Sequence, residues 1–196
     1  YDAHKYYTGR GPLESYAEGL GMQNGDLALR VNFATVADDG KTIIDRRVGR
    51  NLTTQEATQL AEEINSKVKL NNAAFEFKNT IGHRGVLVIR GQKTKLSGWI
   101  TNTDPAYGRE GVFGVALENF PNAILESRPV EGHQKDLKAI EAARLLNEFT
   151  VKSRKVLQEA DVNKKRAGKG KMRGNVIVSR DAGDCLPKFP SIKQMR

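Results

Sequence analysis

The sequence predicts an α+β fold in which helices cover one face of a mostly antiparallel sheet. Three observations lead to this prediction: five segments have strand character, two long segments have helical periodicity, and tight turns join neighbouring strands. The 196 residues, 38% of them hydrophobic, suffice for one ordinary domain, or for one domain with an appendage, and for a buried core. No internal repeat interrupts this order.

The first part of the chain predicts a short helix and a hairpin. Pro12 suits the first position of a helix over residues 13–18, which the following glycines would end. Residues 27–35 form a buried strand, and an Asp-Asp-Gly turn at 38–40 leads into a returning strand over 41–45.

A helix and two further strands follow. Thr53 and Glu56 have the spacing of a capping box, which begins a helix that extends to about residue 66. Residues 73–78 and 84–90 are rich in apolar residues and form two strands joined by a short turn.

The second half is less regular. Residues 91–132 have few regular signals, which is typical of a functional or mobile connection. Residues 164–173 carry six basic residues and predict an exposed loop, and residues 175–179 predict the last strand, followed by a Gly/Pro-rich exit. A long helix over 133–160 is predicted from an apolar stripe made of Leu137, Ile140, Ala143, Leu146, Phe149, Ser153 and Val156.

The charge and the cysteine content limit the classes of ligand and the cellular compartment that we expect. The net charge of +9 favours polyanions or phosphorylated small molecules as ligands. A single cysteine, Cys185, allows no internal disulfide, so we expect a reducing, cytoplasmic location. We expect no membrane span and no signal peptide, and the start at Tyr1 without Met suggests a fragment.

Three arginines, Arg46, Arg47 and Arg50, follow directly after the predicted strand at 41–45, which ends at Asp45. Arginine binds phosphate through two parallel hydrogen bonds, and the turn at Gly49 could aim the three side chains at one point. A solvated basic loop explains the same pattern equally well.

Further candidates lie beside other strands. His83 and Arg84 begin a strand, where a neutral imidazole beside an arginine can contact phosphate or carboxylate; a hydrogen-bonded structural histidine is the alternative. Asp104 is a turn residue by default, since it precedes proline. Arg10 and Lys164 add positive charge. The sequence contains no metal-binding histidine motif and no nucleophile motif, so its residues indicate anion binding without a catalytic centre.

Short strings spread over nearly the whole chain resemble one family, and they occur in that family's order. They are Tyr1–Pro12, Arg30–Thr35, Asp45–Arg50, His83–Val88, Thr103–Pro105, Asn163–Lys164, Arg180–Gly183 and Pro187–Ser191. Together they resemble archaeal-type cofactor-independent (2,3-bisphosphoglycerate-independent) phosphoglycerate mutases of the alkaline phosphatase superfamily.

The resemblance implies a domain inserted into an alkaline-phosphatase-like core. Residues 1–24 would be core, 25–180 the inserted substrate-binding domain, and 181–196 the return to the core. The implied reaction exchanges 3-phosphoglycerate and 2-phosphoglycerate through a phosphoserine, with two divalent metal ions, Mn or Mg. The serine would lie before Tyr1 and most metal ligands after Arg196, so this chain itself would bind no metal.

The resemblance also implies roles for the cationic residues. The arginines at 46, 47 and 50 would grip phosphoglycerate with His83 and Arg84 nearby, and Asp45 would orient an arginine or handle protons. The complete set of expected substrate-binding residues is Asp45, Arg46, Arg47, Arg50, His83, Arg84, Asp104 and Lys164.

Two alternatives stay open from the sequence. The charge and the basic segment at 164–173 would suit a nucleic-acid-binding module, although an aromatic content of 7% and the lack of a nucleic-acid motif argue against that partner. A relative of the mutases that acts on another phosphorylated metabolite is the second alternative.

Overall fold

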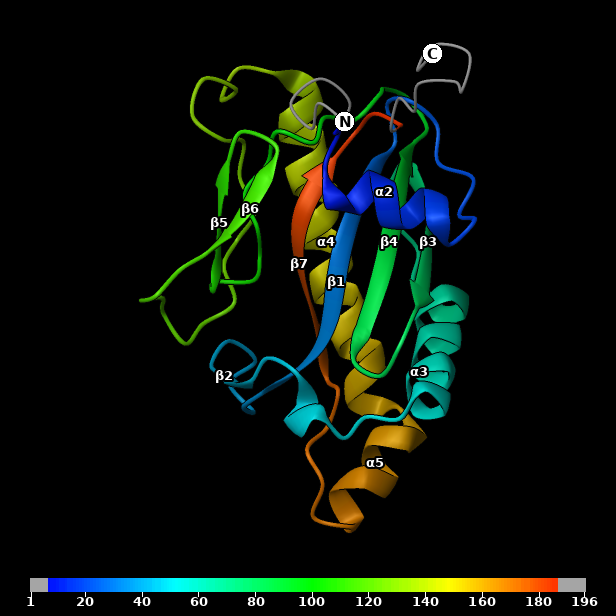
Figure 1. Ribbon diagram of the computed structural model, residues 1–196. Helices are drawn as coiled ribbons and strands as arrows, with labels where there is room; N and C mark the ends of the chain where they lie inside the picture. Colours follow the sequence, from blue (N-terminus) through cyan, green and yellow to red (C-terminus); the bar gives the residue numbers. More distant parts are fainter. Residues whose placement is uncertain (1–6, 187–196) are drawn as a thin grey trace, which may run out of the picture.

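A five-stranded antiparallel sheet forms the centre of the molecule, as the computed structural model of residues 7–186 shows (Figure 1). Strand β1 (Leu27–Val36) pairs with β4 (Arg84–Gly91) on one side and with β7 (Val176–Gly183) on the other. Strand β3 (Ala73–Asn79) extends the sheet beyond β4, and β2 (Ile43–Asp45) pairs with the end of β1. The predicted α+β class with an antiparallel sheet is therefore confirmed.

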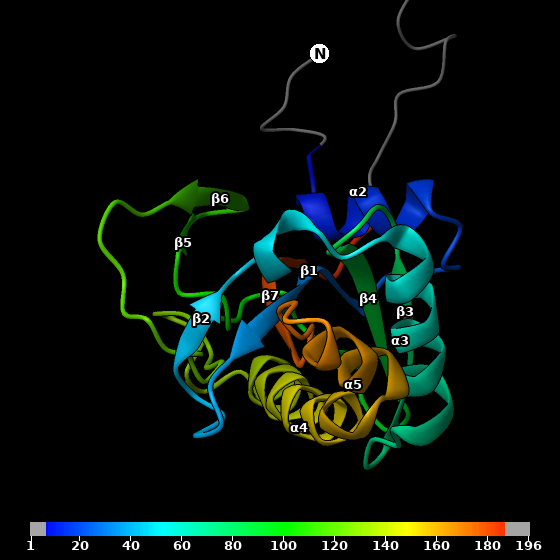
Figure 2. The same ribbon diagram turned by 90° about the horizontal axis from the view of Figure 1, so that it is seen from below.

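Helices cover the sheet unequally. Helices α3 (Thr54–Lys67), α4 (Leu137–Glu159) and α5 (Asp161–Gly168) lie on one side, where α3 and α4 enclose the main core. Helix α2 (Arg10–Ala17) crosses one end of the opposite face (Figures 1 and 2). The layer of helices predicted for one face is present, and α2 adds a short cover to the other.

Alternation along β1 divides the two faces of the sheet. Leu29, Val31 and Phe33 point into the main core with α3 and α4. Because successive side chains of a strand point to opposite faces, the residues between them, Arg30 and Asn32, lie on the other face. This polar stretch of the second face, which α2 leaves uncovered, carries the candidate site.

The local predictions for the first half of the chain hold. The capping box is present, since the Thr53 hydroxyl accepts from the Glu56 amide at 3.2 Å and the Glu56 carboxylate accepts from the Thr53 amide at 2.9 Å. The predicted strands and helices match the observed ones within a few residues at each end.

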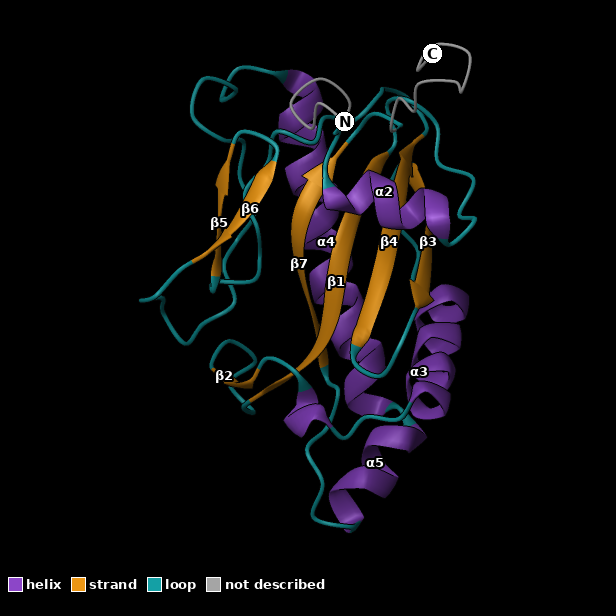
Figure 3. Cartoon of the chain, in the orientation of Figure 1, coloured by secondary structure: helices purple, strands orange, loops and turns teal. Residues whose placement is uncertain are grey.

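The connection at 91–132, predicted to be irregular, contains a hairpin. Strands β5 (Tyr107–Glu110) and β6 (Phe113–Ala116) pair with each other and stand apart from the main sheet, with long loops on either side (Figure 3). The prediction missed them because these strands are short, rich in glycine and only half-buried, so their sequence shows no apolar alternation.

Three predictions for the second half differ from the structure in whole or in part. Residues 164–173 are an exposed loop only from residue 169 onward, because α5 includes three of the six basic residues and buries Arg166 to 2% exposure. The stripe on α4 is shifted at its start, where Leu137 is 77% exposed and Ala139 and Ala142 are buried instead. Strand β7 continues to Gly183, so Arg180 and Asp181 belong to the sheet and not to an exit loop.

The motif strings at 1–6 and at 187–191 lie outside the described residues. Within residues 7–186, no helix combines the length and the apolar character that crossing a bilayer requires.

Candidate anion-binding site

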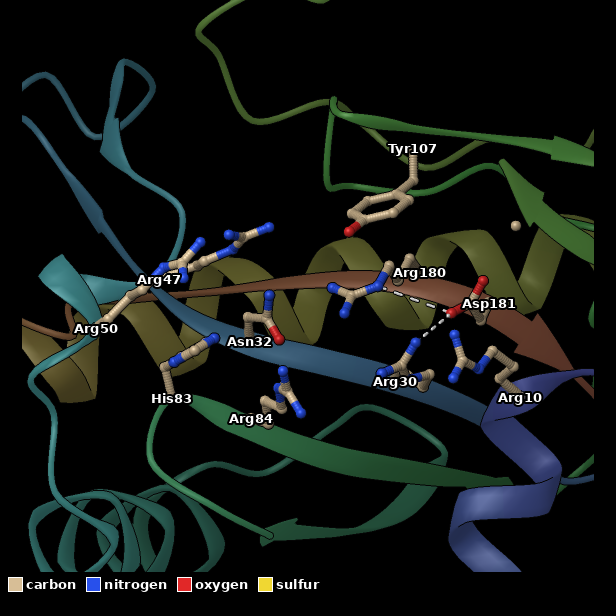
Figure 4. A pocket seen from close by; sticks show the side chains of 11 residues that line it. Arg10, Arg30, Asn32, Arg47, Arg50, His83, Arg84, Tyr107, Arg180 and Asp181 are labelled. Carbon is tan, nitrogen blue, oxygen red and sulfur yellow. Dashed lines mark hydrogen bonds and ion pairs between the residues drawn. The ribbon is translucent and has the colours of Figure 1, made fainter. Parts of the chain in front are cut away.

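A cavity of about 550 Å³ lies over the polar face of the sheet (Figure 4). The sheet strands form its floor, the turn after β2 borders one end, and the β5–β6 hairpin forms a wall. The residues that line it are Arg10, Arg30, Asn32, Arg47, Arg50, His83, Arg84, Tyr107, Gly114, Arg180 and Asp181.

Strand register brings the floor residues together. Arg30 of β1 lies opposite Arg180 of β7, and Asn32 of β1 lies opposite Arg84 of β4. Directly opposed residues in antiparallel strands point to the same face. Three arginines from three strands therefore share one surface, around the amide of Asn32.

The turn after β2 presents Arg47 and Arg50 to the cavity. Asp45 shapes this turn, because its carboxylate accepts hydrogen bonds from the backbone amides of Arg47 at 2.6 Å and Gly49 at 3.0 Å. Val48, Gly49 and Arg50 all have left-handed backbone angles, with φ of 54°, 60° and 54°. Such angles are costly for a β-branched residue, and the complete burial of the Val48 side chain holds the conformation in place.

Arg46 does not line this cavity, whereas the other two arginines of its motif do. Its guanidinium makes two parallel hydrogen bonds, of 2.7 and 2.8 Å, to the carboxylate of Asp104. Asp104 is fully buried and also accepts from Arg180 at 3.5 Å. The carboxylate therefore fixes two guanidiniums from different elements, and the hydrogen bond to Arg46 helps to raise the pKa of that guanidinium against the effect of burial.

The structure brings together half of the predicted site residues. Four of them line the cavity: Arg47, Arg50, His83 and Arg84. Asp45, Arg46 and Asp104 support its walls from behind. Lys164 does not line it, since its ammonium group lies on α5 and forms an exposed ion pair with Glu159 at 3.5 Å.

Positive charge in the cavity is only partly neutralised. Arg30 forms ion pairs with Glu14 at 2.8 Å and with Asp181 at 3.2 Å, and Asp181 also lies 3.7 Å from Arg180. Within residues 7–186, four other lining arginines have no carboxylate at ion-pair distance, and they are Arg10, Arg47, Arg50 and Arg84. The cavity thus lacks the negative charge that would balance it.

The two titratable rings in the cavity respond to this charge. Burial lowers the pKa of His83, and the neighbouring guanidiniums of Arg84 and Arg47 lower it further, which favours the neutral imidazole. Burial alone would raise the pKa of Tyr107, but the guanidiniums of Arg180 and Arg46 outweigh it and lower that pKa.

Besides Gly114, five lining residues were absent from the sequence prediction. Their signal was present in part, because Arg30 and Asn32 are polar residues that alternate with apolar ones inside a buried strand. Tyr107 escaped notice because its hairpin was not predicted. The other two, Arg180 and Asp181, were assigned to the boundary of an exit segment.

We also searched the described residues for side chains that could bind a metal ion together. Among the described residues, no three histidine, cysteine, aspartate or glutamate side chains gather closely enough to hold a metal ion.

Known proteins resemble this chain along its length. The family model for 2,3-bisphosphoglycerate-independent phosphoglycerate mutase matches residues 1–163. The mutase of that name from Aeropyrum pernix is 46% identical over the whole chain, and mutase 1 from Archaeoglobus fulgidus is 36% identical over 98% of it. The cofactor-independent phosphoglycerate mutase of Thermoplasma acidophilum has a similar structure, with a TM-score of 0.73 and 34% identity over 99% of the chain.

The chain corresponds to a part of these proteins. It spans 46% of the Aeropyrum mutase, 43% of the Archaeoglobus mutase and 46% of the Thermoplasma structure. The matches include the turn after β2, strand β4 and helix α2, which carry Arg47, Arg50, Arg84 and Arg10. The chain therefore belongs to the 2,3-bisphosphoglycerate-independent phosphoglycerate mutase family.

Proposed function

We propose that this chain is the substrate-binding domain of a full-length phosphoglycerate mutase that interconverts 3-phosphoglycerate and 2-phosphoglycerate. The observation that carries the proposal is the unbalanced positive charge of the cavity. Among residues 7–186, four of its lining arginines have no carboxylate at ion-pair distance, and they share the lining with a histidine whose lowered pKa favours the neutral form. An anion that enters the cavity relieves the repulsion among these guanidiniums and satisfies their donors.

Size and charge suit a three-carbon acid phosphate. A volume of about 550 Å³ lies within the usual range for small-molecule pockets and is too small for a folded partner. Phosphoglycerate carries a phosphate and a carboxylate, and each can accept paired hydrogen bonds from a guanidinium. In this proposal Arg47, Arg50, Arg84 and neutral His83 contact the ligand, and Asp104 keeps Arg46 and Arg180 in position.

The proposal places the reacting groups in the rest of the full-length protein. The serine that accepts the phosphoryl group would lie there, together with the two divalent ions that activate it. Residues 25–180 would form the inserted domain, and residues 1–24 and 181–196 would connect it to the core. The domain would act as a lid that carries its arginines onto the substrate.

Binding and turnover measurements on two variants test this role. Arg47→Ala and Arg50→Ala should each raise the Kd for 3-phosphoglycerate about tenfold, because a charge-assisted hydrogen bond contributes roughly 1.5–3 kcal/mol. Calorimetry on this chain gives the Kd, and mutase turnover of the full-length protein should fall by a similar factor. Arg128→Ala is the matched control, since the Arg128 side chain is 75% exposed and pairs with exposed Glu126. Unchanged binding and turnover in both cavity variants would refute the proposal.

The two alternatives predict different results. A nucleic-acid-binding module would bind single-stranded DNA with a steep salt dependence, and its affinity would follow the exposed lysines of α5 more than Arg47. A mutase relative with another substrate would lose affinity for that metabolite in the same arginine variants, while 3-phosphoglycerate would compete poorly. Competition by 3-phosphoglycerate against other phosphorylated acids separates this case from the proposal.

A further inference from the structure

The β5–β6 hairpin is a fixed wall of the cavity. The Asn102 side chain donates to the carbonyl of Tyr107 at 2.9 Å, and the Arg109 guanidinium donates to the carbonyls of Gly98 and Ile100. These contacts tie β5 to the segment before it. Hydrogen bonds within the fold thus position the strand that carries Tyr107.

The other strand of the hairpin approaches the floor of the cavity closely. Gly114 of β6 lies against Asp181 of β7, and a Cβ atom at this glycine would come within 2.0 Å of the Asp181 carboxylate. Only a residue without a side chain permits this approach. The hairpin therefore contacts the site at two points, through Gly114 and through Tyr107.

Two guanidiniums hold the ring of Tyr107. The guanidinium carbon of Arg180 lies 4.6 Å from the ring centroid and that of Arg46 lies 5.2 Å from it. Both arginines are in turn bound to buried Asp104, so a carboxylate, two cations and an aromatic ring form one connected unit. Figure 4 shows the Tyr107 hydroxyl at the inner end of the ring, pointing into the cavity toward the arginines.

We propose that Tyr107 is a further ligand-binding residue, whose hydroxyl donates a hydrogen bond to an anionic oxygen of the bound acid phosphate. This inference rests on the proposed function. The phenol faces the unpaired arginines across the cavity, so an anion held by them lies within its reach. The guanidiniums that lower the pKa of Tyr107 also make its hydroxyl a stronger donor.

Removal of one oxygen atom tests the inference. Tyr107→Phe keeps the contacts of the ring with Arg180 and Arg46 and removes only the hydroxyl, which also interacts with the Arg46 guanidinium, so the free energy of unfolding should fall only slightly. The Kd for 3-phosphoglycerate should rise about tenfold, since the bond that is lost leads to a charged acceptor. Tyr16→Phe is the matched control, because Tyr16 is 60% exposed on α2 and does not line the cavity. Calorimetry on the chain and urea unfolding of the same samples provide both quantities.

The outcomes separate the two proposals. If Arg47→Ala weakens binding and Tyr107→Phe leaves the Kd unchanged, the role of Tyr107 is overturned and the proposed function stands. If Tyr107→Phe lowers the free energy of unfolding as much as it weakens binding, the hydroxyl is structural and the inference is again overturned. If the arginine variants bind normally, the proposed function fails and the inference with it.

Discussion

Arg166 and Arg84 show two opposite uses of the same side chain. Arg166 is 2% exposed, and its guanidinium donates to the carbonyls of Met172 at 2.7 Å and Asn51 at 3.3 Å and to the carboxylate of Glu56 at 2.7 Å. Arg84 borders the cavity and has no carboxylate partner within residues 7–186. A guanidinium whose donors are satisfied by the protein stabilises the fold, and one whose donors are free is available to a ligand.

Asp104 is a structural carboxylate that also holds a cavity-lining arginine, Arg180. Its removal should have the largest effect on the free energy of unfolding. Asp104→Ala leaves the largely buried Arg46 without its carboxylate and leaves Arg180 with only the more distant Asp181, at 3.7 Å, so the free energy of unfolding should fall by about 4 kcal/mol. Urea unfolding measures the change, and Glu126→Ala, which removes an exposed carboxylate, is the control. A loss no larger than that of the control would show that Asp104 is not the centre of this unit.

Replacing Arg166 should destabilise the protein without affecting the site. Arg166→Met keeps much of the side-chain volume but leaves the Asn51 and Met172 carbonyls and Glu56 without their donor, so we expect a loss of roughly 3 kcal/mol. The Kd for 3-phosphoglycerate, measured well below the unfolding temperature, should not change. Weaker binding in this variant would contradict the separation of the two classes.

The same change at the cavity should give the reverse result. Arg84→Met should raise the Kd about tenfold and leave the free energy of unfolding within about 0.5 kcal/mol of the parent value. Any change within this range should be towards greater stability, because the substitution removes one of several like charges around His83. Calorimetry and urea unfolding on the Arg84 and Arg166 variants side by side complete the comparison.

The smallest effect should come from His83 and should depend on pH. Its pKa is lowered in the folded state, so between that value and the ordinary value near 6.5 the unfolded chain binds more protons than the folded one. Stability from this group is therefore fully present above about pH 6.5 and is lost as the pH falls through the folded-state pKa. Unfolding free energies measured between about pH 5 and 8 should show this slope, and His83→Gln should reduce it. An equal slope in both proteins would assign the titration to another group.

Sequence patterns predicted the scaffold better than the site, for a physical reason. A capping box and a buried strand are local patterns. The spacing of Thr53 and Glu56 therefore predicts the start of a helix, and the apolar residues within 27–35 predict a strand. In contrast, the acceptors to which a guanidinium donates its hydrogen bonds often belong to residues distant in the chain. Nothing near Arg46 indicates that Asp104 will accept its hydrogen bonds, and nothing near Arg166 indicates Glu56.

Tyr107 and Arg180 illustrate the same limit at the cavity itself. Each entered the site through an element that the patterns did not define, a glycine-rich hairpin and the far end of β7. Arg47, Arg50, His83 and Arg84 were predictable because a strand end and a turn concentrate them in two short strings.

The direction of the Arg50 side chain depends on packing in the hydrophobic interior, because Arg50 belongs to a turn with left-handed backbone angles. Val48 can keep its unfavourable backbone angle only while its side chain stays packed, and Arg50 follows two residues later. If the packing around Val48 were loosened, the backbone of the turn would adopt a more favourable conformation. The Arg50 guanidinium would then no longer point into the cavity. Substitutions that loosen the packing around Val48 should thus weaken ligand binding before they unfold the chain, which makes ligand affinity a sensitive reporter of order in this part of the interior.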